Sequence, residues 1–80
     1  MVNTAQAQST STPYRVTLTD PSGHQWFADE PTDKGGQDTA PNPVQILLSA
    51  LGACTTITLE MYANLKGIKL DHVQVDLALN

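Results

Sequence analysis

Alternation of apolar and polar residues predicts two strands near the beginning of the chain. Over residues 14–19 every second side chain is apolar, which is the period of a strand with one buried face. The sequence Asp20-Pro21-Ser22-Gly23 follows, with proline and glycine at positions that suit a type I turn. Residues 24–28 then return as a second strand. We therefore predict a β-hairpin.

A long helix is predicted over residues 43–66. Asn42 is a favourable N-cap, Pro43 suits the first helical position, and Gln45 completes a capping-box pattern. Gly67 is the predicted stop. Between these signals, apolar residues recur at spacings of three and four in two adjacent stripes. A helix that is apolar on nearly all sides is expected to be buried on most of its surface.

Little else in the chain could cover such a helix. One of its stripes consists of Leu47, Ala50, Leu51, Cys54, Thr58, Met61 and Leu65. Residues 73–79 alternate as a further strand, and the sequence stops inside it. A domain that ends in mid-strand leaves an unpaired edge. We therefore expect an α+β fold, apparently truncated, whose central helix is covered by a partner subunit or by further sequence.

Two other segments are predicted to lie outside the core. Residues 1–12 are poor in large apolar side chains and are expected to form a disordered tail, which leaves residues 13–80 as the domain. Residues 29–41 form a polar surface loop with the pair Gly35-Gly36. No GK[ST] follows the pair, so loop flexibility is favoured over phosphate binding.

Composition narrows the classes of partner. The net charge is −4 with only four basic residues, which excludes a basic patch for nucleic acid or an anionic membrane. The uncharged stretch from Pro43 to Leu59 is interrupted by polar residues and is short for a membrane span. One cysteine and the lack of a signal-peptide pattern predict a reduced thiol in the cytoplasm.

Cys54 is the residue best suited to carry out a chemical reaction, although a free cysteine is most often a small buried hydrophobe. It lies too far along the helix for the helix dipole to activate it. Arg15 is the only arginine that could supply a nearby cation. His24 and His72 lack other ligands at metal spacing and are expected to be solvated, and no metal or cofactor is predicted.

Three pieces of sequence occur in an order that points to a known family. They are Ala28-Asp29-Glu30-Pro31, then Gly35-Gly36-Gln37-Asp38-Thr39, then PNPVQILLSALGACTTITLEMYANLKGIKL. Together they resemble the OsmC/organic hydroperoxide resistance superfamily, over about residues 26–75 and the first half of the family domain.

The resemblance implies an intertwined homodimer in which β-sheets wrap long central helices. It also implies a thiol-dependent peroxidase that reduces organic hydroperoxides. By motif, Cys54 is the peroxidatic thiol. The family arginine that activates it lies upstream on the first sheet, and Arg15 is its only possible counterpart in this sequence. The thiolate becomes a sulfenic acid, which a second cysteine captures and a dithiol reduces.

The sequence departs from the family pattern at three points. The second cysteine is absent from these 80 residues, and the position of a glutamate that holds the family arginine is Val44, followed by Gln45. Losing that carboxylate should misplace the cation and make the Cys54 thiol less reactive. Two alternatives therefore stay open: a non-catalytic module that binds a small apolar ligand at a dimer interface, or an inactive remnant whose helix serves assembly.

Overall fold

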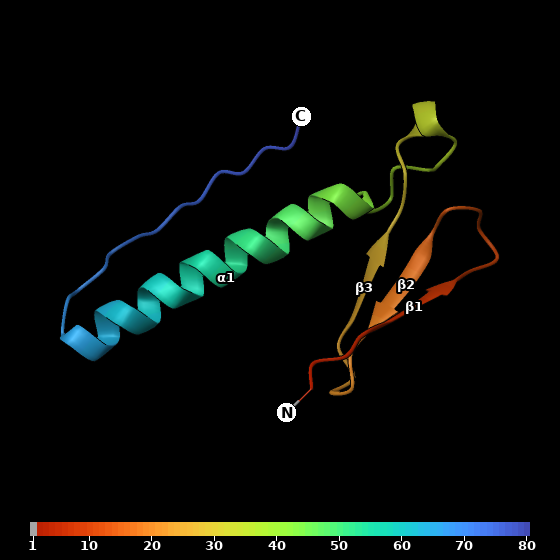
Figure 1. The fold of residues 1–80 in the computed structure, drawn as a ribbon. Helices are drawn as coiled ribbons and strands as arrows, with labels where there is room; N and C mark the ends of the chain where they lie inside the picture. Colours follow the sequence, from red (N-terminus) through yellow and green to blue (C-terminus); the bar gives the residue numbers. More distant parts are fainter. Residues whose placement is uncertain (1) are drawn as a thin grey trace. The chain divides into compact units, whose positions relative to one another are not determined.

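The computed structural model describes residues 2–80 and divides into two compact units (Figure 1). The first unit ends at Ile46, and the second runs from Leu47 to Asn80. Three strands and a short 3-10 helix belong to the first unit, while most of one long α-helix belongs to the second. The predicted α+β class is therefore confirmed. Each unit is described below by itself.

A three-stranded antiparallel sheet forms the first unit. Its strands are β1 (Gln6–Ser9), β2 (Val16–Thr19) and β3 (Gln25–Ala28), which lie side by side in the order β1-β2-β3 (Figure 1). Trp26 lies opposite Leu18 on one face, and Phe27 lies opposite Thr17 on the other. Cross-strand pairs of this kind are the main side-chain contribution to sheet stability.

The predicted hairpin is confirmed as the pair β2–β3. The backbone N–H of Gly23 donates to the carbonyl of Asp20 at 3.1 Å, which closes the turn. The Asp20 carboxylate also accepts the backbone N–H groups of Ser22 and His24, as short polar turn residues commonly do. Strand β2 begins at Val16, later than the predicted start at residue 14. Tyr14 adopts a left-handed conformation (φ 71°), which is incompatible with an extended strand.

The prediction of a disordered tail over residues 1–12 is wrong for β1. Gln6–Ser9 pair in register with residues 16–19 of β2, from Gln6 opposite Thr19 to Ser9 opposite Val16. The β1 side chains are small or polar and all exposed. Backbone hydrogen bonds to a neighbouring strand therefore order this segment, and side-chain hydrophobicity does not reveal them. Met1 lies outside the described residues.

Helix α1 (Pro43–Lys66) begins and ends where the sequence predicts. At its start, the Asn42 side chain accepts the N–H of Gln45 at 2.8 Å, and the Gln45 side chain accepts the N–H of Asn42 at 3.1 Å. This reciprocal pair is a capping box. At its end, Gly67 has a φ of 70°, and the N–H of Ile68 donates to the carbonyl of Ala63 at 2.8 Å. That arrangement is a Schellman motif.

The expected burial of α1 is not provided by the described residues. Only Gly52 and Ala63 of the helix are buried, and Leu65 is 81% exposed. Cover from a partner subunit or from further sequence therefore stays a prediction. By length and composition alone, α1 is also long and apolar enough to cross a membrane. The core helix of a soluble domain passes the same test, so this observation is weak.

Residues 68–80 turn back and run along α1 within the second unit (Figure 1). The predicted strand over residues 73–79 is wrong for this chain, because a strand requires a hydrogen-bonded neighbour and the described residues provide none. The alternation persists in the burial, since Val73, Val75 and Leu77 are half-buried and the residues between them are exposed. Leu77 approaches so closely that a Cβ on Gly52 would lie 2.7 Å from its Cδ1.

Candidate functional site

The carboxylate of Asp29 is the centre of the loop that follows β3. Asp29 is 1% exposed, yet each of its oxygens has a hydrogen-bond donor. Oδ1 accepts the N–H of Glu30 at 2.8 Å. Oδ2 accepts the hydroxyl of Thr39 at 2.7 Å and the N–H of Thr39 at 3.1 Å. A buried carboxylate with this many donors ties the beginning of the loop to its end.

These donors lower the pKa of Asp29 from 3.8 to about 2. The largest cause is the Thr39 hydroxyl, and backbone N–H groups of Thr39, Glu30 and Gln37 add to it, while burial acts in the opposite direction. Hydrogen bonds to the charged form favour that form. Asp29 is therefore a fixed negative charge throughout the neutral range.

Gly36 allows a close backbone approach in the loop around Asp29, and the flexibility that the sequence predicts for the glycine pair stays a prediction. A Cβ on Gly36 would lie 2.0 Å from the carbonyl oxygen of Glu30 and 2.8 Å from Oδ1 of Asp29, so only glycine fits there. The 3-10 helix η1 (Thr32–Lys34) forms one side of the loop. The N–H of Asp38 donates to the carbonyl of Glu30 at 3.0 Å and closes the other.

Arg15, the predicted thiolate partner, is held at this loop. It precedes β2 directly, and its Nη1 donates to the hydroxyl oxygen of Thr39. Its Cζ lies 4.4 Å from the centroid of the Phe27 ring, which is cation–π geometry. The structure thus links Arg15 to Thr39 and Thr39 to Asp29, a chain of contacts that the sequence did not reveal.

The positions where the family pattern has acidic residues carry no anion here. The Gln45 side chain is engaged with the backbone of Asn42 in the capping box, and Val44 is an exposed apolar residue. Neither side chain offers a negative charge to a guanidinium group.

Cys54 lies in α1 as an exposed free thiol. Leu77 contacts the face of α1 that contains Gly52. Residues two positions apart on an α-helix face nearly opposite directions, so Cys54 points away from that face. The neighbouring residues of its stripe, such as Leu51 and Met61, are exposed as well. Within the second unit, the Cys54 face is therefore the uncovered face of the helix.

Arg15 and Cys54 belong to different units. The activation of Cys54 by Arg15 stays a prediction.

The remaining candidates from the sequence have simple roles. His24 is exposed, as predicted, and its Nδ1 lies 2.7 Å from Oδ2 of Asp20. This contact is the largest cause of the lowered pKa of Asp20. His72 is exposed as well. Over residues 2–80, no group of three or more His, Cys, Asp or Glu side chains is placed to hold a metal ion.

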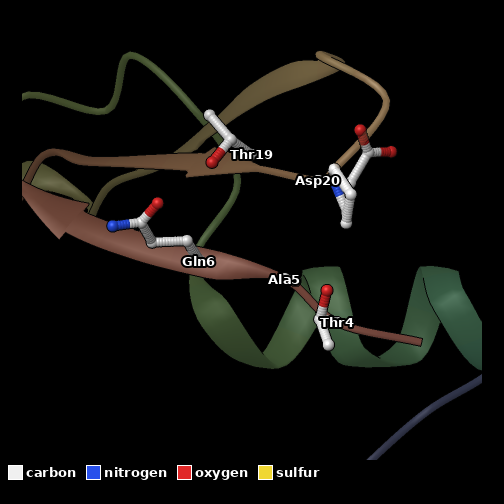
Figure 2. A pocket seen from close by; sticks show the side chains of 6 residues that line it. Thr4, Ala5, Gln6, Thr19 and Asp20 are labelled. Atoms are coloured by element: carbon white, nitrogen blue, oxygen red, sulfur yellow. The ribbon is translucent and has the colours of Figure 1, made fainter. Parts of the chain in front are cut away.

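Figure 2 shows a pocket between the beginning of β1 and the end of β2. It is lined by Thr4, Ala5, Gln6, Thr19, Asp20 and Pro21. Its side chains are small or polar, and Asp20 is already bonded to His24 and to the turn backbone. The lining thus offers neither a nucleophile nor an apolar wall, and we do not assign a function to this pocket.

Comparison with known protein families decides the identity of the domain. The family model for OsmC-like protein matches residues 35–80, which is more than half of the chain. The chain belongs to the OsmC-like family. No curated protein and no solved structure matches it. The OsmC-like match includes Thr39, all of α1 and Cys54, whereas Arg15 and Asp29 precede it.

Sequence analysis of this OsmC-like chain missed Asp29 and Thr39 as parts of the candidate site. The sequence alone does not single out Asp29, because the side chains of adjacent residues such as Asp29 and Glu30 point to opposite sides of a strand and do not form a shared site. A usable signal was present, because an acidic residue directly after an apolar strand and before a glycine pair suits a carboxylate that organises a loop.

Proposed function

We propose that this OsmC-like chain is a thiol-dependent peroxidase in which Cys54 reduces organic hydroperoxides. The observation that carries the proposal is the exposed thiol of Cys54 in the helix that the family match covers. A peroxidatic cysteine must be reached by its substrate, and a buried structural cysteine would not be.

The reaction balances with a dithiol as the reductant. The thiolate of Cys54 attacks the terminal oxygen of the hydroperoxide, the O–O bond breaks, and the alcohol leaves after it takes up a proton. The sulfenic acid that forms on Cys54 is then attacked by one thiol of the dithiol, which releases water. The second thiol displaces Cys54 and closes the oxidised dithiol, returning Cys54 to the thiol. Arg15 is proposed to stabilise the thiolate as a cation.

We also propose that two copies of the chain associate through α1, in the cytoplasm. The support is the row of exposed apolar side chains on the Cys54 face, including Leu47, Leu51 and Met61. In this proposed dimer Cys54 lies at the interface and stays accessible to the hydroperoxide. An apolar surface of this extent is typical of an interface. The net charge of −4 favours neither nucleic acid nor an anionic membrane as the partner.

Sedimentation velocity tests the association. We expect a concentration-dependent dimer for the wild type and a monomer for Leu51→Lys, because a buried unpaired charge opposes an apolar interface. Thr32→Lys, which adds the same charge at an exposed residue of η1, serves as the control and should remain a dimer. A wild-type chain that stays monomeric at all concentrations would contradict the dimer.

The alternative function is a non-catalytic module that binds a small apolar ligand. The observation in its favour is that Val44 and Gln45 provide no anion for the arginine. Substitution of Cys54 by Ser separates the two functions. For a peroxidase, cumene hydroperoxide consumption in the presence of a dithiol should fall to the rate without protein. A binding module would show no consumption beyond that rate with either chain.

A further inference from the structure

The Arg15 guanidinium is fixed from two sides within the first unit. Nη1 donates to the hydroxyl oxygen of Thr39, and Cζ lies 4.4 Å over the centroid of the Phe27 ring. An arginine side chain has several rotatable bonds and loses considerable freedom when it is held in one place. Two contacts of different kinds, one polar and one aromatic, therefore restrict where its charge can lie.

Arg15 can only donate to the Thr39 hydroxyl, and Asp29 is the acceptor that takes the hydroxyl proton. The Thr39 hydroxyl has a single proton, which it donates to Oδ2 of Asp29 at 2.7 Å. Its oxygen lone pairs are therefore left to accept from Arg15. Asp29 is buried and ionised, and only the Thr39 hydroxyl separates its negative charge from the guanidinium group of Arg15. This charge polarises the Thr39 hydroxyl and makes its oxygen a better acceptor for Arg15.

The N-terminal turn of α1 provides no anion for Arg15. Gln45 is engaged in the capping box and Val44 is apolar. We propose that Thr39, oriented by the Asp29 carboxylate, is the positioning residue that holds Arg15 for thiol chemistry in this chain. This inference rests on the proposed function, in which Arg15 stabilises the Cys54 thiolate, and it names the residues that control that same cation.

The test is a cycle of variants of Thr39 and Arg15 in the full chain. The rate of Cys54 oxidation by cumene hydroperoxide is measured against pH for the wild type, Thr39→Val, Thr39→Ser, Arg15→Gln and the double variant Arg15→Gln/Thr39→Val. Thr39→Val should lower the rate at neutral pH by about tenfold, as expected for one lost hydrogen bond to a charged group. It should also move the midpoint of the pH–rate profile upward.

The other variants separate positioning from a general structural effect. Thr39→Ser keeps the hydroxyl and should retain the wild-type profile. In the Arg15→Gln background, Thr39→Val should have no further effect, because the cation that Thr39 holds is already missing. An equal loss in both backgrounds, or an unchanged profile for Thr39→Val, would overturn the inference while leaving the proposed function intact.

A measurement without peroxide tests the contacts directly. Because the Thr39 hydroxyl is the largest cause of the lowered pKa of Asp29, that pKa should rise from about 2 toward 3.8 in Thr39→Val but not in Thr39→Ser. Carboxyl NMR titration gives this value. An unchanged Asp29 pKa would overturn the inference by itself. Wild-type oxidation no faster than that of the unfolded chain would instead contradict the proposed function, and the inference with it.

Discussion

At the scale of single residues, Asp29 shows how a buried charge can organise a loop. It accepts two hydrogen bonds from Thr39 and one from Glu30 within a segment that looks merely polar in the sequence. Its burial became visible only in the structure, because two of the three donors belong to Thr39, which lies ten positions away along the chain. Sequence periodicity describes faces of helices and strands, and it contains no information on such loop contacts.

The lowered pKa of Asp29 predicts how loop stability depends on pH. The pKa is about 2 in the folded chain and 3.8 otherwise, so the folded state holds the proton less tightly. The stabilisation is therefore complete above pH 3.8 and is lost as the pH falls toward 2. The protection of the Thr39 amide against hydrogen exchange, relative to its intrinsic rate at each pH, should fall over that window, because its N–H donates to Asp29.

Asp29→Asn isolates this effect. The new side chain keeps one acceptor oxygen and places its NH₂ group against the donors of either Thr39 or Glu30, so the loop should be less stable at neutral pH, and the dependence between pH 3.8 and 2 should diminish. Asp20 has a lowered pKa in the same direction and remains as a background contribution. Asp33→Asn, in η1, is the control. Identical Thr39 exchange in wild type and Asp29→Asn would contradict the role of Asp29.

At the scale of elements, the ends of α1 could be predicted from the sequence and its surroundings could not. Asn42, Gln45 and Gly67 determine the helix ends through contacts within a few residues. Two predictions were wrong for the same reason: β1 is a strand where a disordered tail was predicted, and residues 73–79 are not a strand where one was predicted. A strand depends on a partner, which β1 has in β2 and residues 73–79 lack within residues 2–80.

The capping box predicts the response of α1 to substitution. Asn42→Ala removes the acceptor for the N–H of Gln45 and should destabilise the helix by about 1 kcal/mol. Helical content from circular dichroism at increasing temperature measures this change. Asn80→Ala, beyond the helix, is the matched control and should have no effect. Unchanged melting of the helix in Asn42→Ala would show that the cap contributes nothing to its stability.

At the scale of the whole molecule, the small number of buried apolar side chains is the main finding. Among residues 2–80, Ala28 and Ala63 are the only buried hydrophobic residues, while Leu47, Leu51 and Met61 are exposed. The sequence predicted that α1 would be buried against other residues, because exposing a helix that is apolar on nearly all sides to water costs free energy. The family pattern identified Cys54 as the reactive residue. It gave position 44, which is Val44 here, as the residue that contacts the arginine, whereas in the structure Arg15 bonds to Thr39.

The most direct test of the central claim is the rate at which Cys54 forms a sulfenic acid. The reduced chain is exposed to a slight excess of cumene hydroperoxide with dimedone present, and intact mass reports the adduct, with a urea-unfolded sample as the control. A peroxidatic Cys54 should form the adduct much faster in the folded chain than in the unfolded one. Equal rates in the two samples would contradict a peroxidase function for this OsmC-like chain.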